Sequence, residues 1–292
     1  MIRILSTLSI LLALSAAGAQ AQTASNITGL YYTGLDSSGG LQAGGATDAN
    51  WTVSYASTNG GTSANSTYEG AAYVIDAADV SGSGYTQNTS TAQWITAPGA
   101  KTSSGTSPNT GGDFLPGNGD SGSNEGIYIY TLAFTITGTG TNGSVIPSSN
   151  SKIQITMTLA ADDQYSVYVN PSGNGSTLPT GTAAATQDSA WSNKSQITLQ
   201  NFNGSGGTNN SQFKLGTNYI VIVVDNTNSV SGSSSSTSLN ASGLLVYQTS
   251  AATINGAPVP EVSTWIPLFG AIGLYGYIVL RRRREALRPV PA

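Results

Sequence analysis

Cysteine and histidine are both absent from this 292-residue chain. Without them the chain cannot build a Ser-His-Asp triad, a cysteine nucleophile or a zinc site with the usual nitrogen and sulfur ligands. Disulfides are excluded as well, so the fold must be held together by its packed core and its hydrogen bonds.

Basic residues are scarce, and most of them lie near the two ends of the chain. Of the 10 lysines and arginines, four lie in the body, namely Lys101, Lys152, Lys194 and Lys214. The other six are Arg3, Arg281, Arg282, Arg283, Arg284 and Arg288. From residue 22 to residue 261 there are 13 acids against the 4 lysines, a formal charge of −9 compared with −4 for the whole chain. An acidic body without arginine disfavours nucleic acid and anionic lipid headgroups as partners and suits a soluble exported protein.

The first 21 residues have the layout of a secretory signal peptide. Arg3 supplies a short positive region, residues 4–17 are mostly apolar, and Ala19-Gln20-Ala21 is an A-x-A cleavage site. We therefore expect a mature chain that begins at Gln22. The alternative, an uncleaved N-terminal anchor, is disfavoured because the apolar run is short for a membrane span.

A second apolar segment, residues 262–280, lies between the motif Val259-Pro260-Glu261-Val262 and a cluster of four arginines. The arginine cluster consists of Arg281, Arg282, Arg283 and Arg284. At about 1.5 Å per residue, a helix of this length would span roughly 28 Å, close to the ~30 Å hydrocarbon core of a bilayer. The arginines would stop the span and stay on the cytoplasmic side with residues 285–292, so the body would lie on the outer side. The alternative, a buried core helix, is disfavoured because core helices seldom end in four arginines.

This tail resembles the sorting signal of bacterial PEP-CTERM proteins, in which a Val-Pro-Glu-Pro motif precedes one membrane helix and an arginine cluster. Val259, Pro260 and Glu261 match the motif, whereas Val262 stands where the family has its second proline. The resemblance implies a partner, an exosortase-like membrane protease or transpeptidase, which would process the protein at the motif. It also implies anchoring in the inner membrane before processing, and then a cell-surface or extracellular location.

The expected folded body covers residues 22–252, which is enough chain for one sizeable core. Alternating or β-branched runs recur between stretches of Gly, Asn, Ser and Asp, and no stretch shows a convincing helical period. The expected strands are residues 27–33, 51–55, 71–75, 93–96, 126–137, 152–159, 165–169, 196–202, 218–224 and 243–248. This pattern predicts an all-β domain, a β-sandwich or jelly roll with long Gly/Ser/Asn-rich loops, and residues 253–258 are expected to be a spacer before the membrane.

Residues 126–247 resemble the galactose-binding-like jelly rolls of carbohydrate-binding modules and of exported PEP-CTERM proteins. The resemblance rests on Ala160-Ala161-Asp162-Asp163 before a strand that ends at Asn170, and on Gly216-Thr-Asn218 leading into an apolar strand. Physically, Asn170 suits a tight turn, and Gly216 allows a positive φ before the strand. Such folds often carry a structural Ca²⁺, so the resemblance also implies a calcium site.

Carboxylates are the remaining candidates for chemistry. Asp162, Asp163 and Asp225 lie in turns rich in Gly and Asn and are the residues that we expect to ligate Ca²⁺, because Ca²⁺ prefers oxygen ligands. The alternative is that the aspartates cap turns; Asp36, Asp48, Asp113 and Asp120 are further oxygen donors of this kind. Asp162 and Asp163 are adjacent, so on a strand they would face opposite sides and could not form a catalytic pair.

Aromatic residues near loop ends are candidates for sugar contact. Trp51, Trp94, Trp191 and Tyr85 are such residues, although each is more readily explained as a core or rim aromatic. We therefore expect an exported, non-enzymatic surface or extracellular-matrix protein associated with biofilm or exopolysaccharide. The alternatives are a dedicated carbohydrate-binding module and, less favoured, an envelope glycosidase. No cofactor other than a structural Ca²⁺ is expected, and no ligand-binding residue can be named from the sequence.

Overall fold

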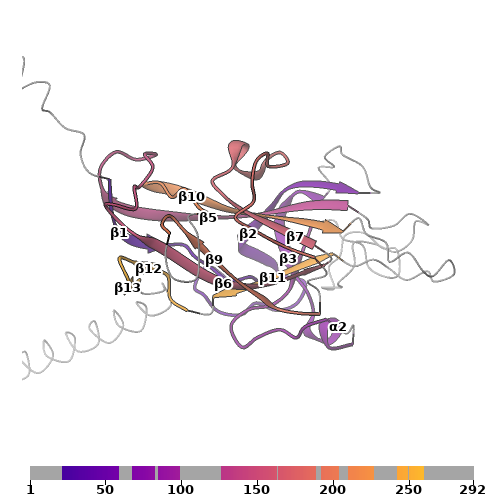
Figure 1. Ribbon diagram of the computed structural model, residues 1–292. Helices are drawn as coiled ribbons and strands as arrows, with labels where there is room; N and C mark the ends of the chain where they lie inside the picture. Colours follow the sequence, from indigo (N-terminus) through magenta and orange to yellow (C-terminus); the bar gives the residue numbers. More distant parts are fainter. Residues whose placement is uncertain are drawn as a thin grey trace, which may run out of the picture.

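A computed structural model describes residues 22–58, 68–82, 85–98, 126–162, 164–188, 192–203, 210–226, 242–248 and 250–259. Within them, strands dominate, accompanied by one short α-helix and one 3₁₀ turn (Figure 1). The strands are β1 (Thr23–Thr28), β2 (Thr47–Thr58), β3 (Gly70–Val74), β4 (Ile95–Thr96), β5 (Gly126–Thr139), β6 (Ile153–Asp162), β7 (Gln164–Val169), β8 (Ala185–Gln187), β9 (Ser195–Gln200), β10 (Gly216–Asn226), β11 (Gly243–Gln248), β12 (Thr253–Ile254) and β13 (Ala257–Pro258). The helix is α2 (Ala77–Gly82), and the 3₁₀ turn is η2 (Ser172–Gly175).

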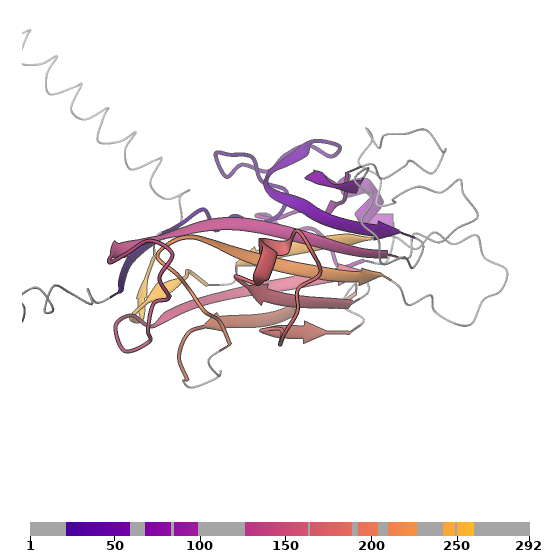
Figure 2. The same ribbon diagram turned by 90° about the horizontal axis from the view of Figure 1, so that it is seen from above.

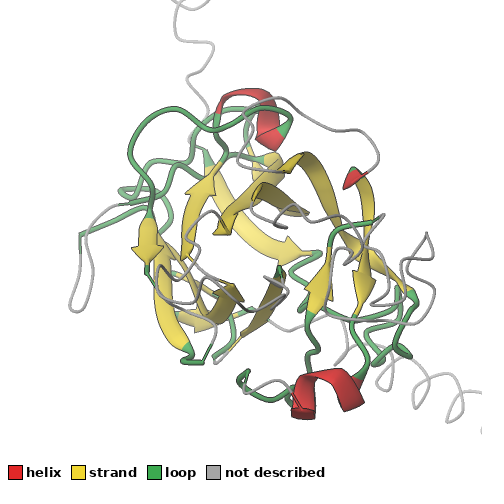
Figure 3. Ribbon diagram, turned by 90° about the vertical axis from the view of Figure 1, so that its right-hand side faces the viewer, coloured by secondary structure: helices red, strands yellow, loops and turns green. Residues whose placement is uncertain are grey.

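All described strand pairs are antiparallel and belong to one hydrogen-bonded sheet. The order is β13-β12-β6-β11-β4-β3-β2-β5-β10-β7-β8, while β1 pairs with β5 and β9 pairs with β6. The sheet curls over on itself, so that the strands surround a common interior when viewed along the strands (Figure 3). The expectation of an all-β fold is confirmed, with the two facing layers joined through β11, β4 and β3.

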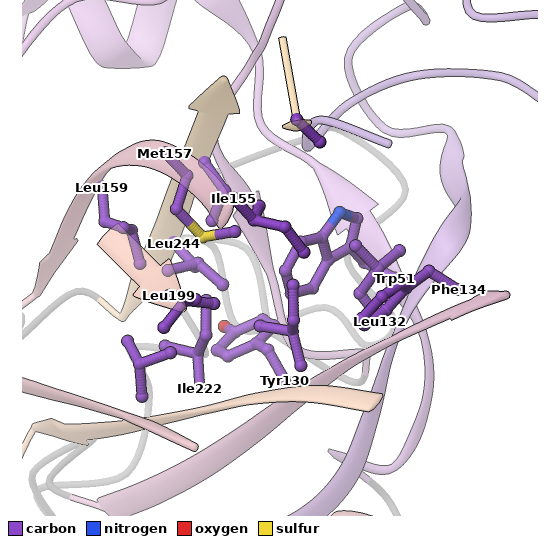
Figure 4. Packing of buried hydrophobic residues seen from close by; sticks show 14 of the residues in the cluster. Trp51, Tyr130, Leu132, Phe134, Ile155, Met157, Leu159, Leu199, Ile222 and Leu244 are labelled. Carbon is purple, nitrogen blue, oxygen red and sulfur yellow. The ribbon is translucent and has the colours of Figure 1, made fainter. Parts of the chain in front are cut away.

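The core fills the space between the two layers. On β5, Tyr130, Leu132 and Phe134 point inward, at alternate positions of the strand. They face Ile155 and Met157 from β6 across the interior (Figure 4). This alternation, visible in the sequence, is the reason why the strand pattern was predictable.

Two long strands, β6 in one layer and β10 in the other, run in the same direction and define two ends of the domain. Lys152 directly precedes β6, which ends at Asp162, and Lys214 precedes β10, which carries Asp225 near its end. At about 3.3 Å per residue, each lysine and its aspartate lie roughly 30 Å apart. We call the end with Lys152 and Lys214 the lysine end, and the opposite one the acid end.

The observed strands differ from the expected ones mainly at their boundaries and in the short edge strands. The first strand is Thr23–Thr28 and not residues 27–33, because Gly29 has a φ of +83° and turns the chain away from β5. β8, β12 and β13 were not expected, since two or three residues give no readable alternation. Neither was α2, which at six residues is too short for a helical period.

The turn roles of two residues are confirmed. Asn170 follows β7 with a φ of +50°, and Gly216 begins β10 with a φ of +84°. Both values lie in the left-handed region, which Gly and Asn adopt most readily.

The expectation of a spacer at residues 253–258 is wrong. Thr253 and Ile254 pair with Gln154 and Ile153 of β6, and the β12–β13 hairpin folds back on itself. Val259 is also part of the core cluster, at 7% exposure. The folded body therefore continues to Val259. If the body ended at residue 252, the start of β6 would lack the hydrogen bonds and the apolar contacts that the β12–β13 hairpin supplies.

Several expectations lie outside the described residues. At the N-terminus these are the signal peptide of residues 1–21 and its cleavage residues Ala19 and Ala21. At the C-terminus they are the motif residues Pro260, Glu261 and Val262, the span 262–280, the membrane-stop arginines Arg281, Arg282, Arg283 and Arg284, and residues 285–292. Among the residues that the structure describes, no helix is long and apolar enough to span a bilayer. The sorting signal therefore stays a prediction from the sequence.

Candidate functional site

Three of the aromatic candidates for sugar contact, Trp51, Trp94 and Tyr85, are core or rim residues, as the favoured explanation predicted. Trp51 and Trp94 are both 0% exposed, and the Nε1–H of Trp51 donates to the carbonyl of Tyr31. The ring of Tyr85 packs edge-on against Trp94, with centroids 5.5 Å apart, and its hydroxyl donates to the Oδ2 of Asp162. These rings fill the space between strands and loops and offer no platform. Trp191 lies outside the described residues.

The expected calcium ligands are not gathered into a described cluster. Asp162 is 3% exposed on β6 and accepts the Tyr85 hydrogen bond, while Asp225 lies on β10 opposite Ile127 and Gln164. Asp163 lies outside the described residues. Among the residues that are described, no group of three or more acidic side chains could hold a metal ion. Calcium binding at these three aspartates stays a prediction.

Two other aspartates organise their own loops. The Oδ1 of Asp36 accepts from the backbone N–H groups of Ser38 and Gly40 and from the Ser38 hydroxyl, at 2.7–2.9 Å. These hydrogen bonds, the Ser38 hydroxyl first, lower the pKa of Asp36. The carboxylate therefore caps a turn, as the alternative to calcium binding predicted.

Asp48 has the same role in a buried setting. Its Oδ2 accepts from the backbone N–H of Gly34 at 2.6 Å, and its Oδ1 accepts from the N–H groups of Asn50 and Trp51 at 2.8 and 2.9 Å. Burial raises the pKa of Asp48 although these bonds oppose the shift. Its acceptor capacity is used by the protein itself.

The outer face of the β2–β5–β10–β7 layer is largely covered. Ile129 and Val221 are 0% exposed there and pack with Tyr55 in a small separate cluster. The turn η2 lies on this face, and the hydroxyl of Ser54 donates to the Gly175 carbonyl at 3.0 Å. Figure 2, seen from above, shows the turn resting across these strands. The cluster is a satellite core under a loop.

The outer face of the β9–β6–β11 layer is built differently. Since Ile155, Met157 and Leu159 of β6 point into the core, Gln154, Thr156 and Thr158 point outward. We call this surface the Thr–Gln face; its residues are Gln154, Thr156, Thr158, Gln196, Thr198 and Tyr247.

Strand register sets the side chains of the Thr–Gln face in rows. Thr156 lies opposite Thr198, with 3.4 Å between their hydroxyl oxygens, and Thr158 lies between Gln196 and Tyr247. Thr156 and Thr158 form the floor of the face, at 8% and 5% exposure. Gln196 is exposed, and Tyr247 is half-buried. The result is an array of amide and hydroxyl side chains on strands that lie about 4.8 Å apart.

Aromatic rings and one cation line a border of the Thr–Gln face. The Nζ of Lys194 lies 5.4 Å from the centroid of the Tyr247 ring. The N–H of Thr33 donates to the Val246 carbonyl at 3.0 Å, which brings Tyr32 alongside β11, and both tyrosines pack against the cluster that contains Leu245. Half-buried rings beside an array of uncharged donors and acceptors form a surface suited to sugar rings, which present apolar C–H faces and hydroxyl edges.

A small apolar cavity lies between the layers. The residues that line it include Leu30, Tyr31, Trp51, Met157 and Val246. Its volume of about 10 Å³ admits about one water molecule. A sugar would not fit there.

The sequence did not single out the Thr–Gln face. The alternation in residues 153–159 and 195–200 does place Thr and Gln on one side of each strand. However, the pairing of β6 with β9 and β11 is a property of the fold. A row of Thr and Gln at alternate strand positions was the signal that could have found it.

Comparison with known proteins adds little to this description. No protein-family model matches the chain, and no curated protein matches it. A solved structure with some similarity contains the cysteine protease and lectin-like domains of a surface-layer-associated protein of Clostridium difficile. The identity is 15%, the match covers 80% of this chain and 55% of that chain, and the TM-score is 0.23. A TM-score this low carries no conclusion about the fold or the function of this chain.

Proposed function

We propose that this chain is an exported, non-enzymatic surface or extracellular-matrix protein that binds polysaccharide through its Thr–Gln face. The observation that carries the proposal is the row Gln196, Thr158 and Tyr247, which sets an amide, a hydroxyl and a half-buried ring side by side on three neighbouring strands. Sugar recognition requires this combination of a flat apolar surface with oriented polar groups.

The charge of the body indicates the kind of polysaccharide. The Thr–Gln face has only uncharged side chains, with Lys194 at its border, and the body as a whole carries −9. Such a body repels polyanions at long range. An uncharged exopolysaccharide is therefore the favoured ligand class.

The route to the envelope is the second part of the proposal. The signal peptide, Val259 to Val262, the span 262–280 and the arginines from Arg281 to Arg284 support export followed by processing by an exosortase-like enzyme. Mass spectrometry of the exported protein should then find a C-terminus near Pro260. If the exported form kept the span and the arginines, the protein would instead be a tail-anchored membrane protein.

Sugar binding can be tested on glycan arrays with the full chain in a non-glycosidic detergent. Replacing the exposed Gln196 by Ala should lower the affinity several-fold, because an oriented hydrogen bond contributes about 1 kcal/mol. Gln187→Ala is the matched control, because Gln187 is an exposed strand glutamine on β8. It should leave binding unchanged.

The tyrosine ring gives a second matched pair. Tyr247→Ala should abolish most of the binding, whereas Tyr219→Ala, which removes a half-buried ring from the covered outer face, should not. Equal losses in both variants would show that folding, and not the Thr–Gln face, was affected. Absence of saturable binding to any array glycan would remove sugar binding from the proposed function.

A further inference from the structure

Val259, the first residue of the motif Val259-Pro260-Glu261-Val262, is held inside the folded body. Its backbone N–H donates to the Ala252 carbonyl at 2.6 Å, and its side chain is 7% exposed in the core cluster with Ala252 and Ile254. The backbone offers one N–H donor at this residue, so an enzyme cannot bind it while Ala252 does. Nor can the side chain lie in the core and in an enzyme pocket at the same time.

The hairpin that holds Val259 is closed by a tight turn. Asn255 and Gly256 join β12 to β13, and their φ values are +56° and +81°. Two successive positive φ values are typical of the type I′ turn of two-residue hairpins. Asn255 also fastens the turn at the lysine end, because its Oδ1 accepts from the Lys152 N–H at 2.8 Å and its N–H donates to the Lys152 carbonyl at 2.7 Å. The turn therefore fixes the start of β13 and, through it, the position of Val259.

β13 is the end strand of the sheet order, and among the described strands it pairs with β12 alone (Figure 1). Its two residues, Ala257 and Pro258, are exposed, whereas Val259 after them is buried. An edge segment with so few buried side chains can open locally at a lower free energy than the whole domain. The hairpin can therefore open while the rest of the body stays folded.

Opening of the hairpin would also lengthen the link between the body and the expected span. With Val259 in the core, Pro260 and Glu261 alone separate it from the start of the span at Val262, so the link reaches about 10 Å when extended. Release of residues 253–259 adds about 24 Å of extended chain. A membrane-embedded enzyme that must surround the motif gains this room only when the hairpin is open.

We propose that residues 252–259 form a latch: the β12–β13 hairpin keeps Val259 in the core and must open before an exosortase-like enzyme can process the motif. This rests on the proposed function, in that the tail must be processed there. The rate of processing then follows the population of the open hairpin, as proteolysis does when local opening and closing are fast. A folded body is therefore processed more slowly than the same tail would be without its hairpin.

A reversible cross-link tests the latch in the full chain, in the bacterium that produces it. Thr253 and Pro258 lie directly opposite each other on β12 and β13, so Thr253→Cys with Pro258→Cys places two thiols at the spacing that a disulfide needs. The chain has no other cysteine with which they could pair. In a pulse-chase experiment the cross-linked variant should lose its tail roughly tenfold more slowly than the wild-type chain, because a disulfide removes open conformations. A reductant added during the chase should restore the rate.

The matched control is a second cross-link of the same kind at another place. Thr28 and Thr135 lie directly opposite each other on β1 and β5. Thr28→Cys with Thr135→Cys should therefore form a disulfide without holding the hairpin, and its tail should be lost at the wild-type rate.

Weakening the latch should have the opposite effect. Asn255→Ala removes the side-chain hydrogen bond to the Lys152 N–H and places alanine at a positive φ, so processing should become about fivefold faster. Asn174→Ala is the matched control, because Asn174 is likewise an exposed asparagine that precedes a glycine, with a φ of +51°. It should leave the rate unchanged.

Failure of the latch differs from failure of the processing on which it rests. If the wild-type chain keeps its tail throughout the chase, processing at the motif is wrong and the latch with it. If the wild-type chain is processed and the cross-linked variant equally fast, processing stands, the enzyme reads only residues beyond Val259, and the latch is wrong. The latch is also wrong if reductant does not restore a slow cross-linked variant, or if Asn255→Ala is processed no faster than Asn174→Ala.

Discussion

The Nδ2–H of Asn170 donates to the Oδ1 of Asn218 at 2.9 Å and joins the end of β7 to the start of β10. Asn218 is 0% exposed and fully paired. Its Oδ1 also accepts from the N–H of Lys214, and its Nδ2 donates to the carbonyls of Lys214 and Gly216. Asn170 in turn accepts from the N–H of Tyr219 at 2.9 Å. Asn170 and Asn218 are among the residues from which the sequence predicted a galactose-binding-like domain, and in the structure they hold β7 and β10 together.

Replacing Asn218 by Asp should therefore destabilise the domain by about 3 kcal/mol at pH 7, because an isosteric carboxylate loses both donors and buries a charge. The loss should shrink as the pH falls below about 5, where the new carboxyl becomes neutral. Urea unfolding at several pH values measures this. Asn174→Asp, at an exposed positive-φ position, is the control and should stay within about 0.5 kcal/mol. A pH-independent loss at position 218 would contradict the charge explanation.

Asp48 and Asp36 should give pH dependences of opposite sign. The pKa of Asp48 is raised in the folded state above its value of about 3.9 in the unfolded chain. Protonation of Asp48 therefore stabilises the fold below that unfolded-state pKa, and this stabilisation is lost as the pH rises through the pKa of the folded state. Because the pKa of Asp36 is lowered, its contribution is present above the unfolded value and is lost as the pH falls through the folded pKa. In urea unfolding between about pH 3 and 7, the deficit of Asp48→Asn should shrink with rising pH, and that of Asp36→Asn should grow. Parallel slopes would refute the assignment.

Gly175→Ala should lift η2 off the covered outer face. A Cβ at this position would lie 2.7 Å from the Thr131 Oγ1 and 3.1 Å from the Ser54 Oγ, with φ at +88°. Gly143→Ala is a close control, because its φ is +84° and no atom lies within 4 Å of the added Cβ. Both variants lose about 1 kcal/mol to the backbone, and Gly175→Ala should lose about 1–3 kcal/mol more to the clash. Equal melting temperatures would show that the turn adapts freely.

Tyr130→Phe should be nearly neutral, within about 0.5 kcal/mol, or slightly stabilising. The Tyr130 hydroxyl is fully buried, and no described group lies in hydrogen-bonding geometry to it. Tyr85→Phe removes a hydroxyl that donates to the carboxylate of Asp162, so it should cost about 1–3 kcal/mol. Chemical denaturation of both variants tests the contrast. A loss of about 2 kcal/mol or more in Tyr130→Phe would mean that an internal water satisfies its hydroxyl.

Much of the fold could be predicted because it depends on local pattern. The alternation in residues 126–137 and 218–224 indicated strands, and the positive φ values at Asn170 and Gly216 followed from residue type. The edges could not be predicted in this way. β12 and β13 form because β6 offers an open edge to residues 253–258, and such an edge exists only after the sheet has assembled.

The site shows the same division. Composition excluded histidine and cysteine chemistry, separated the acidic body from its basic ends, and indicated export and a membrane tail, because these depend only on which residues are present and in what order. Whether a ring is core or surface depends on what lies across from it: Trp51 and Trp94 became core, and Tyr247 stayed at a surface. The tertiary structure also decided that Lys152 and Lys214 lie at one end of the domain and Asp162 and Asp225 at the other. Strand direction and register bring these residues, which are distant in sequence, to the same end.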